Sequence, residues 1–256
     1  MGKAGHCAVL ALLLAATTAC LILHPGRETT VFLPTGSSGY TLVLDAGHGG
    51  EDGGAVSLTG VPESGINLDI VLKLDQILGL YGQSPVVLRT SDISLHDESA
   101  GTLREKKVSD LHNRVSAIED VENAVLLSVH QNNFTNSKYH GAQVFFAPTS
   151  GSQELAVHTQ ETLRAALDPD NARQAKPIPD TVYLMSHISC PGILIECGFL
   201  SNPEEEALLR TSGYQTKLAA AMAGAWLQYV WSAQQMRTGE PSNEKQDYVL
   251  LYTVRE

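Results

Sequence analysis

The sequence predicts a single α/β domain built on a twisted, mostly parallel or mixed sheet, with helices on both faces. Short apolar runs bounded by turn residues alternate along the chain with longer stretches in which apolar residues recur at helical spacing. That alternation is typical of βα units, whose strands pair in parallel. A chain of 256 residues with 43% hydrophobic content can also bury a sizeable core.

Strands are predicted where a short apolar run ends in turn residues. The run at 41–44 leads into a glycine-rich loop, and the runs at 124–129 and 192–195 are continuous, as in buried strands. The predicted strands cover residues 41–45, 85–90, 125–130, 142–147 and 192–198.

Helices are predicted between and after these strands. The first begins after Pro62, a residue suited to a helix start, and its apolar side chains recur every three or four residues. Leu155 and Leu163 give the third helix its apolar side, and Asn202-Pro203 is a good cap and first-turn pair for the fourth. The predicted helices cover residues 63–81, 109–120, 152–167, 203–210 and 214–231.

The formal net charge of −11 argues against a nucleic-acid partner, because phosphate binding needs clustered Lys and Arg. The one local basic run, at 104–107, is short and is predicted to be a solvated loop. Outside the amino-terminal region only Cys190 and Cys197 remain, and strand alternation turns Cys197 away from Glu196. Both are predicted to be free cysteines in the core.

Three short segments each place a metal- or proton-handling side chain where an apolar run ends. Two histidines and one carboxylate, with a fourth position left to water, form the ligand set in which zinc lowers the pKa of bound water to about 7. A second carboxylate must then carry the proton. The sequence therefore favours a hydrolytic zinc centre. The three segments are Asp45-Ala-Gly-His48-Gly-Gly50, Ser128-Val-His130-Gln-Asn132 and Glu196-Cys-Gly-Phe-Leu-Ser-Asn202.

Each of these candidate residues can also be explained without a metal site. His48 lies at the carboxyl end of a strand, where ligands bind in open α/β sheets, but a glycine-rich loop also suits phosphate. The stretch lacks GxGxxG and GKS/GKT, which argues against a nucleotide. Glu63 falls in a first helical turn, where any carboxylate compensates the helix dipole. His130 shares a strand face with Ser128 and Asn132, a polar group that fits either a site or a strand end in solvent.

Glu196 follows a buried strand, and a charged side chain is almost never buried without a partner. A nearby divalent cation would stabilise it. An arginine such as Arg114 would do so as well, in a structural ion pair.

Taken together, the segments resemble the zinc-dependent N-acetylmuramoyl-L-alanine amidases of the amidase 3 family, which cleave the amide between the lactyl group of muramic acid and the stem peptide of peptidoglycan. The resemblance covers about 41–229 and includes a helix-start Glu followed by Asn-Leu, matched by Glu63, Asn67 and Leu68. It implies one zinc ion (Zn2+) per chain. The implied ligands are His48, Glu63 and His130, the implied general base and acid is Glu196, and the residues implied to orient ligands or substrate are Asp45, Ser128 and Asn132.

Outside these motifs the chain is most similar to the germination-specific amidases of the spore cortex. The subgroup implies removal of stem peptides so that muramic-δ-lactam can form in cortex peptidoglycan. One departure is Glu119, where many relatives carry Asn. The stretches that carry this similarity are 88–92, 103–107, 141–143 and 173–176.

The ends of the chain suggest export. Residues 1–24 are predicted to be a signal peptide or an uncleaved membrane anchor, because Lys3 precedes an apolar run that ends at His24-Pro25. Residues 25–39 are a predicted linker, 40–232 the catalytic domain and 233–256 a C-terminal tail. We expect the protein in the cell envelope or the spore intermembrane space, secreted or membrane-anchored.

Three alternatives stay open at this stage. Another zinc hydrolase of peptidoglycan, a peptidase or a deacetylase, would use the same metal chemistry on a different bond. An inactive wall-binding module would have lost a ligand or the base, yet all four residues are present. The third is an amidase that needs an activating protein partner. In each case the expected ligand is peptidoglycan, a glycan strand with its stem peptide.

Overall fold

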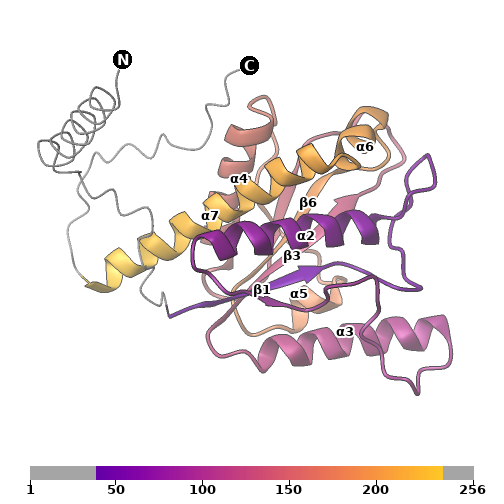
Figure 1. Ribbon diagram of the computed structural model, residues 1–256, viewed down its shortest axis with the longest axis horizontal. Helices are drawn as coiled ribbons and strands as arrows, with labels where there is room; N and C mark the ends of the chain where they lie inside the picture. Colours follow the sequence, from indigo (N-terminus) through magenta and orange to yellow (C-terminus); the bar gives the residue numbers. More distant parts are fainter. Residues whose placement is uncertain (1–38, 239–256) are drawn as a thin grey trace, which may run out of the picture. The chain divides into compact units, whose positions relative to one another are not determined.

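Within residues 39–238, the part of the chain that the computed structural model describes, a six-stranded sheet has the order β2-β1-β3-β6-β4-β5 (Figure 1). The predicted mixed sheet is confirmed. The parallel strands are β1 (Thr41–Ala46), β2 (Val86–Val87), β3 (Ala124–Asn132) and β6 (Gly192–Phe199), and the strands of opposite direction are β4 (Gln143–Phe146) and β5 (Lys176–Pro177).

Helices cover both faces of this sheet, as predicted (Figure 1). One face carries α2 (Glu63–Leu80), α4 (Ser152–Leu167) and α7 (Ser212–Thr238). The opposite face carries α3 (Leu103–Glu119) and α5 (Tyr183–His187). The short helix α6 (Pro203–Leu209) follows β6 and contacts its end, and Asn202 caps it by accepting from the backbone N–H of Glu204 at 2.9 Å.

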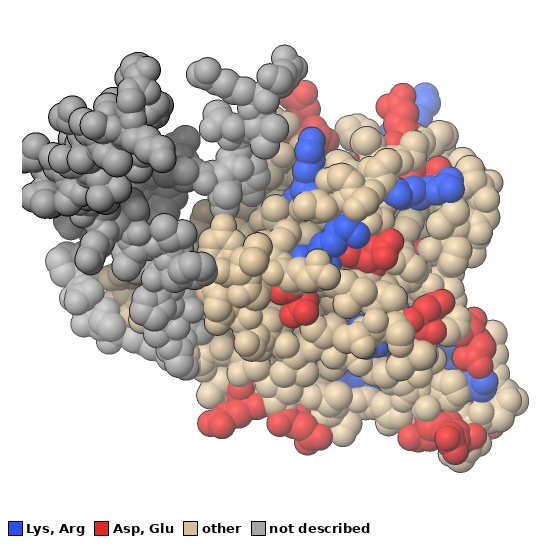
Figure 2. All heavy atoms as spheres, viewed as in Figure 1, with Lys and Arg blue, Asp and Glu red and all other residues tan. Residues whose placement is uncertain are grey.

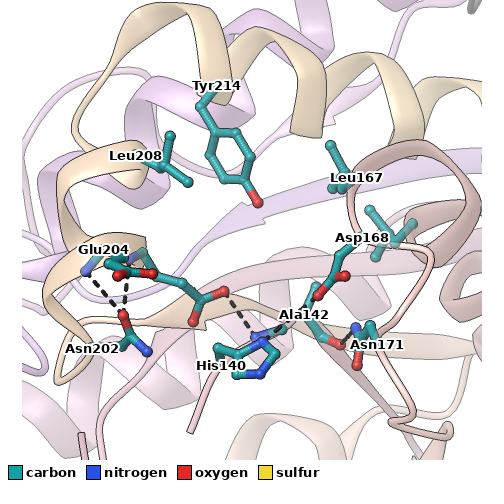
Figure 3. Close-up of a pocket in the computed structure, with 12 residues that line it drawn as sticks. His140, Ala142, Leu167, Asp168, Asn171, Asn202, Glu204, Leu208 and Tyr214 are labelled. Carbon is teal, nitrogen blue, oxygen red and sulfur yellow. Dashed lines mark hydrogen bonds and ion pairs between the residues drawn. The ribbon is translucent and has the colours of Figure 1, made fainter. Parts of the chain in front are cut away.

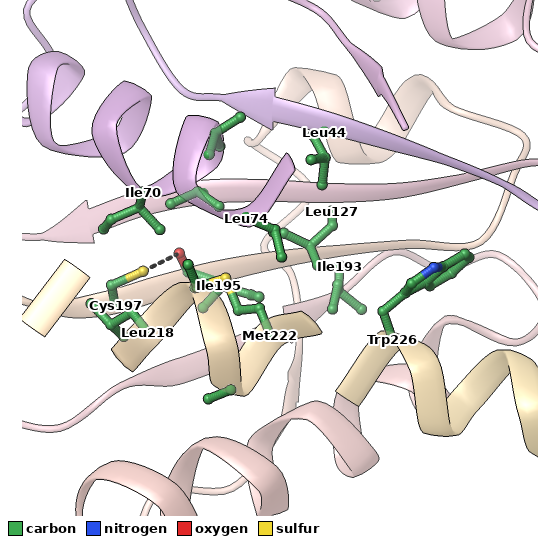
Figure 4. Close-up of a cluster of buried hydrophobic side chains, with 14 of the residues drawn as sticks. Leu44, Ile70, Leu74, Leu127, Ile193, Ile195, Cys197, Leu218, Met222 and Trp226 are labelled. Atoms are coloured by element: carbon green, nitrogen blue, oxygen red, sulfur yellow. Dashed lines mark hydrogen bonds between the residues drawn. The ribbon is translucent and has the colours of Figure 1, made fainter. Parts of the chain in front are cut away.

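Strand alternation divides the apolar side chains of the sheet between two cores. Consecutive residues of one strand, such as Val43 and Leu44 in β1, belong to opposite cores. A one-residue slip would therefore expose both sets, which fixes the register. The larger core, on the side of α2, α4 and α7, includes Leu44, Ile70, Leu74, Leu127, Ile193, Ile195, Met222 and Trp226 (Figure 4).

Helix α3 begins at Leu103 rather than at the predicted residue 109. The Thr102 hydroxyl accepts from the backbone N–H of Glu105 at 3.2 Å, and the Glu105 carboxylate accepts from the Thr102 N–H at 2.8 Å. This capping box is visible in the sequence as Thr-x-x-Glu. The basic run 104–107 is therefore the first turn of a helix and not a solvated loop, and its Lys107 pairs with Asp52 at 2.8 Å.

Several other predicted bounds also differ from the observed ones. The strand predicted at 85–90 is only Val86–Val87, and beyond it the buried Arg89 donates from Nε to the Ala46 carbonyl at 2.8 Å. Strand β5 and helix α5 were not predicted, since 2 and 5 residues are too short for a periodic pattern. Helix α7 continues to Thr238, so the predicted domain end at residue 232 falls inside it.

Both Cys190 and Cys197 are free, as predicted, and Cys197 packs in the larger core. Residues 1–38, with the predicted signal segment and linker, lie outside the described residues, as do residues 239–256 of the predicted tail.

No helix within 39–238 is both long and apolar enough to cross a membrane. On the face in Figure 2, Lys and Arg side chains lie singly among the acidic ones.

Leu74→Ala should destabilise the domain by about 2–5 kcal/mol, because it leaves a cavity between α2 and the sheet. The matched control is Leu80→Ala in the same helix, where the side chain is 71% exposed and the expected change is within about 0.5 kcal/mol. Denaturant unfolding of both variants gives the comparison. Equal losses would contradict this assignment of the buried face.

Candidate metal centre

The structure brings the predicted metal-binding residues together at the carboxyl edge of the parallel strands. His48 lies in the loop after β1, Glu63 is the first residue of α2, and His130 lies near the end of β3. One ligand atom from each of the three falls within 4.8 Å of the others. Glu196 on β6 is the direct neighbour of His130 in the parallel register. All four candidates therefore meet at one place.

The Glu63 carboxylate faces both imidazoles. Its Oε1 is 3.0 Å from His48 Nε2, and its Oε2 is 3.7 Å from His130 Nδ1. The two rings stand edge to face, with centroids 5.0 Å apart. Two imidazole nitrogens and one carboxylate oxygen that converge in this way form a donor set suited to zinc.

The glycine-rich loop lets His48 approach the other two residues. His48 adopts a positive φ of 62°, and a Cβ at Gly54 would lie 2.3 Å from a Glu63 oxygen. Asp52 accepts a hydrogen bond from His48 Nδ1 at 3.0 Å, which leaves Nε2 to face Glu63. Burial alone would lower the pKa of His48, but its bonds to Asp52 and Glu63 raise it to about 9. Asp52 was not predicted, because its only signal in the sequence is its place four residues after the histidine.

Glu63 is buried, so the alternative of a surface residue that compensates the helix dipole is wrong. Its Oε1 accepts from the Ala55 N–H at 2.8 Å and its Oε2 from the Gln131 N–H at 2.8 Å. Asn67, one turn further along α2, donates to Oε2 at 3.3 Å. Burial opposes ionisation, yet the close imidazoles of His130 and His48 hold the pKa of Glu63 well below its usual range. The carboxylate is thus ionised and fixed, as a metal ligand must be.

Arg114 does not pair with Glu196, so that alternative is also wrong. Its buried guanidinium forms ion pairs with Asp45 and with Asp110, the latter at 2.8 Å. It also donates to the His48 carbonyl at 2.8 Å. Asp45 in turn accepts from the Ser128 hydroxyl at 2.6 Å, so Asp45 and Ser128 act on the site through the loop that carries His48.

Glu196 has no such partner. Its Oε2 is buried and makes no hydrogen bond among the described residues. Burial raises the pKa of Glu196 to about 7, even though His130 acts to lower it. A carboxyl with a pKa near neutrality can both accept and donate a proton at pH 7, which is the property required of a general acid and base.

A separate cavity of about 280 Å³ lies beside α4, α6 and the start of α7 (Figure 3). None of the four site residues lines it. Two of its three carboxylates already have protein partners, since Glu205 accepts from the N–H groups of Gly141 and Phe199 at 2.8 Å each, and Asp168 lies 3.7 Å from His140. The chemistry of the predicted site therefore lies elsewhere, at the sheet edge.

A histidine–glutamate–histidine group at the carboxyl edge of a parallel sheet, beside a buried carboxyl, is an arrangement that metal-dependent hydrolases use. Comparison with known proteins identifies the family. The chain belongs to the N-acetylmuramoyl-L-alanine amidase family, whose model matches residues 42–227. It is therefore a peptidoglycan amidase.

Individual relatives agree with this assignment. The chain is 36% identical over 193 residues to the germination-specific N-acetylmuramoyl-L-alanine amidase of Bacillus subtilis, covering 75% of this chain and 80% of the relative. The structure is similar to that of the CwlD amidase from Clostridioides difficile in complex with the GerS lipoprotein, with 39% identity, a TM-score of 0.72, and coverage of 75% and 98% of the two chains. A second amidase, from Clostridium difficile 630, gives 30% identity and a TM-score of 0.66, with 77% and 99% covered.

Arg114→Met should lower the free energy of unfolding by about 3–5 kcal/mol, because it leaves the buried Asp45 carboxylate without its counter-charge. Arg104→Met in the exposed first turn of the same helix serves as the control and should change stability by less than about 0.5 kcal/mol. Chemical denaturation measures both. A loss for Arg114→Met no larger than that of the control would show that the pair does not hold the site together.

Proposed function

We propose that this chain uses one zinc ion to hydrolyse the amide between the lactyl group of N-acetylmuramic acid and the L-alanine of the stem peptide. His48, Glu63 and His130 hold the metal, and Glu196 is the general base and acid. The observation that supports this proposal is the convergence of three donor atoms within 4.8 Å, next to a buried Glu196 oxygen that accepts no hydrogen bond from residues 39–238.

The surroundings of the three ligands fit a metal. Zinc in such a donor set polarises a carbonyl and makes water acidic. Asp52 fixes the orientation of His48, and the N–H groups of Ala55 and Gln131 fix Glu63. These contacts hold the donors in place, as in other metal sites where a second layer of hydrogen bonds orients the ligands.

Glu196 handles the proton. It removes a proton from the attacking water and delivers it to the L-alanine nitrogen as the amide bond breaks, because an amine leaves poorly unless it is protonated. Burial raises the pKa of Glu196 to about 7, so both halves of this transfer are accessible at neutral pH. Glu63, which is ionised and bound by two backbone N–H groups, cannot exchange a proton in this way.

Substitution of the two glutamates should have different effects on bound zinc and on activity. Glu63→Ala should lose bound zinc and, with it, activity, and excess zinc should restore part of the rate. Glu196→Gln should keep its zinc but lose activity by about 10²–10⁴-fold, with no rescue by zinc. Metal analysis and analysis of the digestion products of peptidoglycan measure both, with the exposed Glu204→Gln as the unaffected control.

The same digestion distinguishes the alternatives. An amidase releases the amino group of L-alanine and cuts neither the glycan nor the peptide. Cleavage inside the peptide, or release of acetate, would replace the proposal with a peptidase or a deacetylase. If Glu196→Gln loses zinc while Glu63→Ala retains it, the two roles are reversed.

We further propose a role in spore cortex maturation, outside the cytoplasm in the cell envelope or the spore intermembrane space, with residues 1–24 as export signal or membrane anchor. The 36% identical germination-specific relative supports this role. The complex of the Clostridioides difficile amidase with a lipoprotein supports a protein partner for this chain as well.

Expression of this chain in Bacillus subtilis that lacks its germination-specific amidase should restore muramic-δ-lactam to the cortex, because the lactam can form only after the stem peptide is removed. The Glu196→Gln variant should restore none. Muropeptide analysis of purified spores measures the lactam. A chain that is active on peptidoglycan in vitro but restores no lactam would contradict the cortex role alone.

A further inference from the structure

Two stretches that the zinc centre does not use, 141–143 and 173–176, meet in the structure. Arg173 donates from Nε to the His140 carbonyl at 2.8 Å and from Nη1 to Gln143 Oε1 at 3.0 Å. Gln143 in turn donates from Nε2 to the Gln174 carbonyl at 2.6 Å. The segment around Gln143 thus holds the guanidinium of Arg173, some 30 residues further along the chain, in a fixed position.

This guanidinium lies close to the proposed acid and base. Gln143 is the direct partner of Glu196 in the antiparallel pair of β4 and β6, and directly opposed residues share one face of a sheet. His130 is the partner of Glu196 on its other side. Neighbouring strands are about 4.8 Å apart, so Gln143 lies roughly two strand spacings from His130, and Arg173 lies next to Gln143.

Arg173 is held firmly but has no acidic partner. Its guanidinium carbon lies 4.6 Å from the centre of the Phe199 ring and 5.9 Å from that of Tyr139, within cation–π range. Among the described residues it forms no ion pair. Glu205, the acid that feels its charge, uses both oxygens on backbone N–H groups.

Three other arginines of the domain pair with an acid, whereas Arg89 is fully buried and donates to backbone carbonyls. Arg114 pairs with Asp45, Arg164 pairs with Glu161 at 2.5 Å, and Arg210 pairs with Glu206 at 3.2 Å. In a chain with 28 acidic and 17 basic residues, carboxylate partners are abundant. A half-buried guanidinium that is fixed in place without one is suited to a carboxylate that comes from outside the protein.

We propose that Arg173 binds a free carboxylate on the peptide half of the substrate, at the residue that follows L-alanine. This inference rests on the proposed function. An extended peptide advances about 3.5 Å per residue, so a carboxylate one residue beyond L-alanine lies within about 7 Å of the scissile nitrogen. A hydrogen bond adds about 3 Å, so the carboxylate can span the one to two strand spacings between Glu196 and Arg173. Gln143 acts as a positioning residue, because its side chain holds the guanidinium.

Two substrates that differ in one group test this assignment. They are N-acetylmuramoyl-L-alanyl-D-glutamate and N-acetylmuramoyl-L-alanyl-D-isoglutamine, in which the α-carboxylate is replaced by an amide. The zinc-loaded full chain should cleave the acid with a kcat/KM at least about 10-fold above that of the amide, since hydrogen bonds between two charged groups are stronger than those to a neutral amide. Arg173→Met should bring this ratio close to one.

Arg173→Lys keeps the charge and the packing on Phe199 but loses the fork of donors, so it should retain part of the preference. The control Lys138→Met removes an exposed positive charge near the same aromatic residues and should keep the full ratio.

A wild-type ratio near one would overturn the inference. So would an Arg173→Met variant that loses activity while its ratio is unchanged. If the wild type cleaves neither compound at the lactyl amide but Arg173 still sets the binding preference, the proposed function fails and the carboxylate site stands.

Discussion

The buried ion pair between Arg114 and Asp45 is the interaction on which the site depends. It joins α3 to β1, and the same guanidinium holds the carbonyl groups of Ala46 and His48. Arg89 approaches the loop from the other side and donates to the Ala46 and Gly47 carbonyls at 2.8 and 3.1 Å. Burying two guanidinium groups is costly unless every donor finds an acceptor. Here the acceptors include two carboxylates and the backbone carbonyls of the glycine-rich loop, which is thereby fixed close to Glu63.

The register of the parallel strands places the rest of the site. Asp45 lies opposite Ser128, and two residues further along β3, His130 lies opposite Glu196. One register therefore sets both the structural ion pair and the pair of functional residues. All these side chains point to the face that carries α3, whereas the residues between them fill the core under α2 and α7. A slip of one residue would exchange the two sets.

Two glutamates of identical chemistry acquire different properties from their surroundings. Glu63 receives two backbone N–H groups and lies against both histidines, which keeps it ionised despite burial. Glu196 lies in the same region without a hydrogen bond to Oε2, and burial raises its pKa to about 7. Environments that push the pKa values of two carboxyl groups apart separate a fixed charge from a proton carrier. Arg173 adds a third element, a fixed positive charge on the far side of Glu196.

The sequence by itself determined the fold class, most element bounds and the four candidate residues. Each of His48, Glu63, His130 and Glu196 follows an apolar run or begins a helix, and such positions are local patterns. The start of α3 was equally local, in the Thr102–Glu105 capping box, although the sequence analysis did not use it. Only the tertiary structure decided that Arg114 pairs with Asp45, that Asp52 orients His48, and that Gln143 lies opposite Glu196 and holds Arg173. These contacts join residues far apart in the chain or across a turn. They depend on strand order and register, which no local spacing encodes.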